Sequence, residues 1–179
     1  MSKNQSFIVP SALIIKKKNI FETDQMVTFI SPTFGKITCL AKGNRRLHSK
    51  KMTILQSGNL AKIYLIKGKN LLLLTQAESI SSLDNNYSLH IKKNILQFLE
   101  ILDQIMVEQE IEHFIYDEIC IIRDLICQQN NLSLIRSKIK GLLLMFGFNL
   151  EKEGEFKFLS GYIAYLTNKP LKSFAFLTI

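Results

Sequence analysis

The spacing of apolar residues along the chain changes near residue 80. Before that point, short runs rich in β-branched and other apolar residues alternate with turn signals such as Ser31-Pro32 and Gly68-Lys69-Asn70. These runs predict strands over residues 7–15, 26–30, 36–41, 60–66 and 71–76. Five short strands with brief connections are typical of a small closed or nearly closed barrel. The last run begins with four leucines, which predicts a strand covered on both faces.

After residue 85 the apolar residues follow the period of a helix. Their spacing of three and four residues predicts helices over residues 91–106, 114–126 and 134–146. Beyond residue 150 the pattern is less regular, and we expect a strand over 156–159 and a short helix or strand over 171–177. The predicted fold class is α+β. It consists of a five-stranded barrel domain at residues 1–80 followed by an all-α helical domain at residues 81–179.

Positive charge is concentrated in the first part of the chain. The formal net charge is +8 over 179 residues, but residues 1–70 hold 13 Lys or Arg against two acids, Glu22 and Asp24. The remaining residues hold 10 Lys or Arg and 13 acids. A basic first module beside a mildly acidic second one indicates two different roles, and the field of the first favours an anionic partner.

The densest basic stretch follows the third predicted strand. Gly43-Asn44 allows a sharp turn there, and the stretch is predicted to be a hairpin loop of the barrel. Its cations are Lys42, Arg45, Arg46, Lys50 and Lys51, and further positive charge comes from Lys16, Lys17, Lys18 and Lys36. A flexible cationic loop suits a polyanion better than a small substrate, although a merely solvated loop is the alternative. The chain has no tryptophan, and most of its aromatic residues in this part are expected in the core. Phosphate contacts would therefore dominate over base stacking.

The sequence offers little to an enzyme. It has no glycine-rich phosphate loop, and Cys39, Cys120 and Cys127 lack the spacing of a zinc site. We expect no catalytic residue, no cofactor and no metal. Glu151, Glu153 and Glu155 are expected in a solvated turn. The N-terminus lacks the apolar segment of a signal peptide, and no apolar run is long enough to span a bilayer, so a cytoplasmic location is expected.

Four segments in the first 80 residues resemble bacterial RecO, a family of DNA repair proteins that act as recombination mediators. They are residues 12–16, the Phe-Glu-Thr-Asp of 21–24, the Gly-Lys…Ala-Lys-Gly-Asn-Arg-Arg of 35–46 and the Leu…Thr-Gln-Ala-Glu of 71–78. The segments come in the order of the family. The resemblance implies an N-terminal OB-fold, binding of single- and double-stranded DNA, and annealing of complementary strands. It also implies help in loading a recombinase, with RecR and single-stranded DNA-binding protein as partners in the bacterial nucleoid.

The end of the chain departs from that family. Many members carry a four-cysteine zinc module there, but residues 150–179 contain no cysteine, and the helical part is shorter than usual. The resemblance assigns contact with the acidic tail of single-stranded DNA-binding protein to this part. Arg136, Lys138 and Lys140 are the candidates for it, with a solvated helix face as the alternative. Two other functions remain open, namely an RNA-binding OB-fold module and a scaffold that docks an acidic protein tail.

Overall fold

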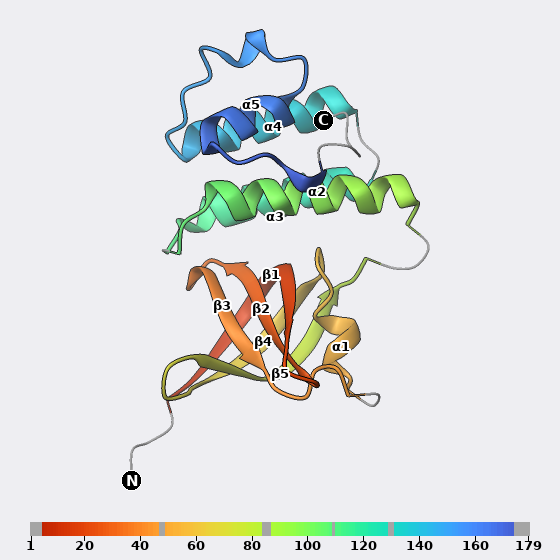
Figure 1. Cartoon of the computed structure of the whole chain (residues 1–179), viewed down its shortest axis with the longest axis vertical. Coiled ribbons are helices and arrows are strands. Elements are labelled where there is room, and N and C mark those ends of the chain that lie inside the picture. The colour runs from red at the N-terminus through yellow and green to blue at the C-terminus, as the bar shows by residue number, and fades with distance from the viewer. Residues whose placement is uncertain (1–4, 47–48, 84–86, 109, 129–130, 174–179) are drawn as a thin grey trace. The chain divides into compact units, whose positions relative to one another are not determined.

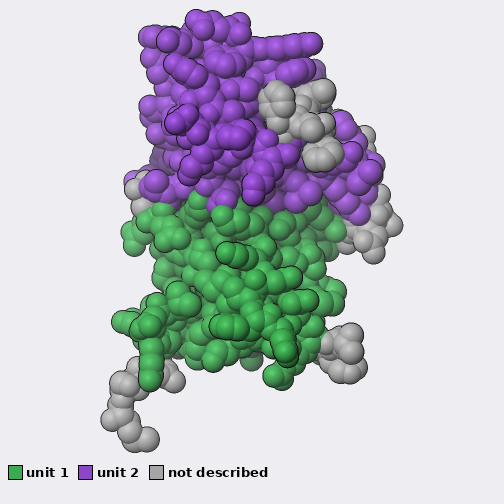
Figure 2. Space-filling view, in the orientation of Figure 1, with its two compact units in different colours: residues 1–83, 108–111 green, residues 84–107, 112–179 purple. Residues whose placement is uncertain are grey.

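The computed structural model describes residues 5–46, 49–83, 87–108, 110–128 and 131–173. These divide into two compact units, shown in separate colours in Figure 2. The first comprises residues 1–83 together with 108–111, and the second comprises 84–107 together with 112–179.

The first unit is a ring of five strands (Figure 1). Its elements are β1 (Ser6–Ile20), β2 (Asp24–Ser31), β3 (Gly35–Ala41), the short helix α1 (Lys51–Ile54), β4 (Leu60–Lys67) and β5 (Leu72–Ser81). The strand order is β1-β2-β3-β5-β4, closed by the pairing of β4 with β1. Among the strands that the structure describes, only the pairing of β3 with β5 is parallel. This is a five-stranded OB-fold barrel with its helix between β3 and β4, so the predicted fold class is confirmed.

A bent first strand closes the ring. The first half of β1 pairs with β4 and the second half pairs with β2. Register shifts fall between Val9 and Ala12 and between Ile14 and Lys16. Pro10 lies in the first irregularity, where its lack of an N–H donor interrupts no regular pairing. Because β1 bends at these points, one strand serves two neighbours and the inward-facing residues enclose a core.

The core of the barrel is filled from all five strands. Ile14, Val27, Phe29, Cys39 and Leu65 are among its fully enclosed members. The run of four leucines around the start of β5 predicted a strand buried on both faces, but β5 is more exposed than that. Leu71 is 45% exposed, and of the four leucines only Leu74 is fully buried, so the expectation of cover on both faces is wrong. Alternation along β5 sends only every second side chain inward.

The second unit consists of α2 (Leu89–Ile105), α3 (His113–Cys127), α4 (Leu132–Met145), a 3₁₀ turn η1 (Glu153–Glu155) and α5 (Leu159–Thr167). Helix α3 packs against α2 and α4, and α2 also contacts α5. Ser88 caps α2 by accepting from the Ile91 N–H, and Asn131 caps α4 through the Ser133 N–H. The three predicted helices are therefore present.

The structure corrects the expectation for the C-terminal segment. The strand predicted over residues 156–159 is absent from the described part of the chain, because α5 begins at Leu159. Leu159, Tyr162 and Ile163 are buried at helical spacing, and this period overrides the short β-like run before them. The ring of Phe156 packs against that of Tyr162, with 5.4 Å between the ring centroids. The element expected over 171–177 lies largely outside the described residues.

Candidate nucleic-acid interface

The sequence predicted that the basic loop after β3 is a hairpin loop, and this prediction is wrong. Strand β5 lies between β3 and β4 in the ring, so the chain crosses from β3 to β4 through the loop and α1. The prediction failed because the sequence reveals the strands but not which of them are neighbours. As a crossover, the loop lies against the β1–β2 turn.

Three hydrogen bonds fasten the loop to that turn. The Gly43 N–H donates to Asp24 Oδ1 at 2.8 Å, and the Arg45 N–H donates to the Thr23 carbonyl at 3.0 Å. The buried amide of Asn44 donates to Gln25 Oε1 at 2.6 Å. Gly43 has a φ of +63°, a conformation that glycine adopts without steric cost. The start of the loop is therefore held in one conformation by its backbone, and its charged side chains are left to the surface.

Four of the five loop cations are exposed. These are Lys42, Arg45, Arg46 and Lys50. The Arg45 guanidinium donates to the Glu22 carbonyl at 3.1 Å, which uses one of its five donors and leaves the rest available. Lys51, in α1, is half-buried; its ammonium donates to the Lys42 carbonyl at 3.2 Å, and burial lowers its pKa. The arrangement gives a fixed backbone that carries exposed positive groups, which is suited to phosphate contacts.

Asp24 is the acid at the centre of this cluster. The Gly43 N–H holds the pKa of its carboxyl below the usual range, helped by the Thr23 hydroxyl and by the charges of Lys42 and Arg46. Its contribution to loop anchoring is therefore present above the ordinary carboxyl pKa. That contribution is lost as the pH falls through the lowered value. Asp24 therefore stabilises the turn by holding Gly43 of the basic loop.

Replacing Asp24 with asparagine should strengthen binding of a polyanion. Asparagine retains an oxygen that accepts from Gly43, but it removes the negative charge beside the loop cations. We expect the affinity for single-stranded DNA to rise about two- to fivefold at low salt, as one exposed charge at close range implies. Fluorescence anisotropy titrations would measure this change. Asp24→Ala is the matched control: it removes the acceptor as well, and a gain equal to that of Asp24→Asn would show that anchoring is irrelevant.

The three lysines of β1 lie within the strand and not at its end, because β1 continues to Ile20. Lys17 pairs in register with Val27, which faces the core, whereas Lys16 and Lys18 alternate to the opposite face and are exposed. The Lys17 ammonium donates to Gln56 Oε1 at 2.6 Å, and burial lowers its pKa. The three side chains therefore do not share one surface.

Lys36 is the least accessible of the predicted DNA-binding residues. It is the second residue of β3, lies opposite Ile30 and is 9% exposed. Of the predicted DNA-binding residues, the exposed ones are therefore Lys42, Arg45, Arg46 and Lys50 of the loop and Lys16 and Lys18 of β1. No pattern in the sequence predicts this burial, because lysine is seldom enclosed.

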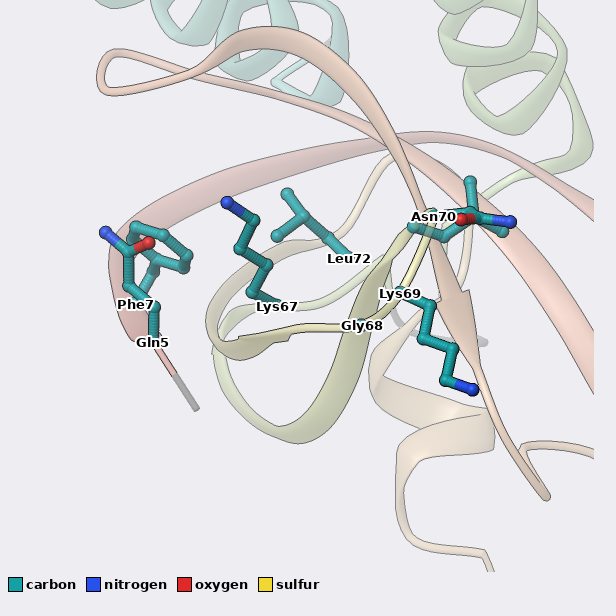
Figure 3. Close-up of a pocket in the computed structure, with 8 residues that line it drawn as sticks. Gln5, Phe7, Lys67, Gly68, Lys69, Asn70 and Leu72 are labelled. Atoms are coloured by element: carbon teal, nitrogen blue, oxygen red, sulfur yellow. The ribbon is translucent and has the colours of Figure 1, made fainter. Parts of the chain in front are cut away.

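A small cavity of about 260 Å³ lies at the β4–β5 turn (Figure 3). Phe7 and Leu72 form part of its lining, and the exposed Lys67 and Lys69 flank Gly68 with their ammonium groups directed apart. Its volume is below the range typical of ligand pockets. The two lysines add to the positive field of the barrel unit.

In the helical unit, the candidate tail-binding cations are paired with acids of the same unit. Arg136 and Lys140 both contact Glu153, at 2.5 and 2.7 Å, and Lys138 contacts Glu118 at 3.0 Å. Glu153 is only 12% exposed, so its expected place in a solvated turn is wrong. The pattern missed this contact because η1 lies well beyond α4 in the sequence, and only folding brings them together.

The pairing of Glu153 predicts an acid-sensitive step in stability. The bonds from Lys140 and Arg136 lower the pKa of Glu153, so its stabilisation is present above the ordinary pKa and is lost as the pH falls through the lowered one. At pH 7, Glu153→Gln should lower the free energy of unfolding by about 1–2 kcal/mol, because both partners are a third exposed. Denaturation at pH 7 and in acid would measure the difference, which should vanish in acid. A constant difference would contradict the assignment, and Glu155→Gln on the same turn is the control.

The aromatic residues of the barrel unit divide sharply. Phe29 is fully buried. Phe7 and Phe34 both pack against the core, and their rings meet edge to face with 5.6 Å between the centroids. Phe21, in contrast, is 85% exposed at the tip of the β1–β2 turn. The sequence had placed most of these aromatics in the core. Two features of the sequence indicate that Phe21 is exposed: the neighbouring acid Glu22 and the position of both residues in the turn after the lysines of β1.

Other chemistry is sparse in the described part of the chain. Burial raises the pKa of the Cys39 thiol to about 12 and that of Cys120 to about 11, which keeps both protonated at neutral pH. Within the described ranges, no three or more His, Cys, Asp or Glu side chains gather as metal ligands would. None of the described helices is long and apolar enough to cross a membrane.

Comparison with known proteins agrees with this geometry. Residues 7–83 match the family model described as recombination protein O N terminal. The chain is 33% identical over 82 residues to the DNA repair protein RecO of Cutibacterium acnes, an alignment that covers 44% of this chain and 33% of that protein. It is 32% identical over 71 residues to the RecO of Heliobacterium modesticaldum, covering 40% and 26% of the two chains.

A longer alignment extends past the barrel. The RecO of Acetivibrio thermocellus is 27% identical over 106 residues, which cover 59% of this chain and 42% of that protein. The matches thus span less than half the length of these relatives. The family model matches the unit that carries the anchored basic loop, and the strand order of this unit is that of an OB-fold. Residues 7–83 are therefore similar to the N-terminal domain of recombination protein O.

Proposed function

We propose that this protein is a DNA-binding recombination mediator of DNA repair, which anneals complementary strands and assists the loading of a recombinase on single-stranded DNA. The observation that carries the proposal is the anchored basic loop. Its backbone is tied to the β1–β2 turn by Asp24 and Thr23, and its exposed cations project from that fixed base. The similarity of residues 7–83 to the N-terminal domain of recombination protein O supports DNA as the polyanion.

Annealing requires no covalent step in this proposal. Two DNA strands repel each other through their phosphates, and a cationic surface that contacts both lowers this repulsion and raises their local concentration. The exposed cations Lys42, Arg45, Arg46 and Lys50 would supply the contacts, with Lys51, Lys16 and Lys18 at the margin. Phosphate contacts carry no sequence information, so the preference for particular base sequences should be weak.

The salt dependence of binding tests this proposal. If the five loop cations each meet a phosphate, the slope of log affinity against log salt on single strands is about −3.5. Affinity would then fall on the order of a hundredfold between 50 and 200 mM salt. Titrations of a labelled oligonucleotide at several salt concentrations measure the slope. A slope near zero would refute phosphate contacts, and stronger binding of structured RNA than of DNA would favour the alternative of an RNA-binding module.

Partner proteins are proposed on the resemblance to RecO. RecR and single-stranded DNA-binding protein are the expected partners, with Arg136, Lys138 and Lys140 as the contact for the acidic tail of the latter. In the structure these cations already bind Glu153 and Glu118. An acidic tail would therefore have to displace those carboxylates, and we expect its binding by this chain to be weak unless it also buries apolar groups. Calorimetric titration with an acidic peptide, repeated on Glu153→Gln, would measure the competition.

A further inference from the structure

Phe21 occupies an unusual position at the tip of the β1–β2 turn. It is 85% exposed, which is the largest exposure among the large apolar side chains of the described residues. Its backbone has a φ of +52°, in the left-handed region. Residues without a β-carbon adopt this region freely, whereas a bulky side chain there is unfavourable. The fold itself would therefore be served better by glycine at this position, and packing gives no reason for a phenyl ring.

The turn that carries Phe21 is bonded to Arg45 of the basic loop, and it also contains the acids Glu22 and Asp24. The residue after Phe21, Glu22, accepts a hydrogen bond from the Arg45 guanidinium at 3.1 Å, and Thr23 accepts from the Arg45 N–H at 3.0 Å. Asp24 closes the turn and holds Gly43. The turn and the basic loop are thus one connected structure, which presents a flat apolar ring beside guanidinium and ammonium groups. An apolar protein partner would need the ring but would not need these cations.

We propose that Phe21 is a stacking platform for an unpaired base of a strand whose phosphates contact the basic loop. The proposal rests on the function proposed above and adds a preference for single strands. In a duplex, both faces of a base are covered by its neighbours, so only a single strand or an unpaired end offers a face to the ring. Stacking on every kind of base is possible, so the preference is for strandedness and not for sequence.

The absence of tryptophan from the chain gives this proposal a direct probe. Phe21→Trp introduces a single indole at the proposed contact, and we expect its fluorescence to be quenched when single-stranded DNA binds. Ile8→Trp is the matched control, because Ile8 is also an exposed apolar residue, at 58%, but lies near the start of β1, whereas Phe21 follows the end of that strand. Equal quenching in both variants, or none in Phe21→Trp while DNA binds, would overturn the proposal.

Affinity measurements separate stacking from charge. Phe21→Gly removes the ring and suits the positive φ, so its melting temperature should equal or exceed that of the parent. We expect its affinity for single-stranded DNA to fall about 5- to 150-fold, with the salt slope unchanged. Phe21→Tyr should retain most of the affinity. Affinity for an abasic oligonucleotide, which has the same phosphates, should be the same for Phe21→Gly and the parent.

The outcomes distinguish this inference from the proposed function. If the parent binds DNA with a steep salt slope and Phe21→Gly binds it equally well, the stacking role is refuted and the proposed function stands. If the parent binds no nucleic acid at all, the proposed function itself fails. If Phe21→Gly keeps its DNA affinity but loses a protein partner such as RecR, the ring is a protein contact and the stacking role is again refuted.

Discussion

Arg45→Glu/Arg46→Glu should bind single-stranded DNA at least about 25-fold more weakly than the parent at 0.1 M salt, and should lose strand annealing. Both side chains are exposed on the anchored loop. Two lost phosphate contacts reduce the slope of log affinity against log salt by about 1.4. At 0.1 M salt this change in slope lowers the affinity by about 25-fold. The introduced carboxylates add repulsion to the loss. The measurements are anisotropy titrations over a salt series and annealing of two complementary oligonucleotides.

The control for this result needs the same change in net charge elsewhere. Lys152→Glu/Lys157→Glu provides it, since both lysines are exposed in the helical unit. The Lys152 ammonium lies over the ring of Tyr165, and the Lys157 ammonium lies over the ring of Phe158. This variant should keep most of the affinity and the full slope. Equal losses in both variants would show that net charge is responsible and not the loop. Unchanged annealing by a folded Arg45→Glu/Arg46→Glu would remove the loop from the proposed mechanism.

Phe29→Ala should lower the stability of the barrel unit by about 3–5 kcal/mol, a large part of the total of about 5–15 kcal/mol typical of a domain. Phe29 is fully buried on β2, between Ile14 of β1 and Ile37 of β3 in register. Truncation of the ring leaves a cavity that the closed ring of strands cannot collapse around. Amide hydrogen exchange in β2 and β3 reports this loss for the barrel unit alone.

Phe21→Ala is the matched control for that experiment, because it makes the same chemical change on the same hairpin. Phe21 is 85% exposed, so its truncation should change stability by less than about 0.5 kcal/mol. Phe29→Leu, which fills most of the space, should cost about 1 kcal/mol and retain DNA binding. If both alanine variants lose stability equally, the exposure of Phe21 or the enclosure of Phe29 is wrong.

Most of the secondary structure followed from the sequence. Five β-rich runs before residue 80 and three helical periods after residue 85 correspond to β1–β5 and α2–α4. These patterns are local, since burial of one face imposes a period of two on a strand and of 3.6 on a helix. The segment after residue 150 was the exception, because Phe156 and Phe158 resemble a strand while the buried face of α5 begins only at Leu159.

The sequence by itself also determined the positive character of the first 70 residues and the RecO-like segments at 12–16, 21–24, 35–46 and 71–78. Neither depends on how the chain folds. Only the tertiary structure decided which side chains are available, because that depends on strand neighbours and on contacts between distant residues. It enclosed Lys36, turned Lys17 away from Lys16 and Lys18, and paired Arg136 and Lys140 with Glu153. It also separated two phenylalanines on one hairpin, one in the core and one beside the basic loop.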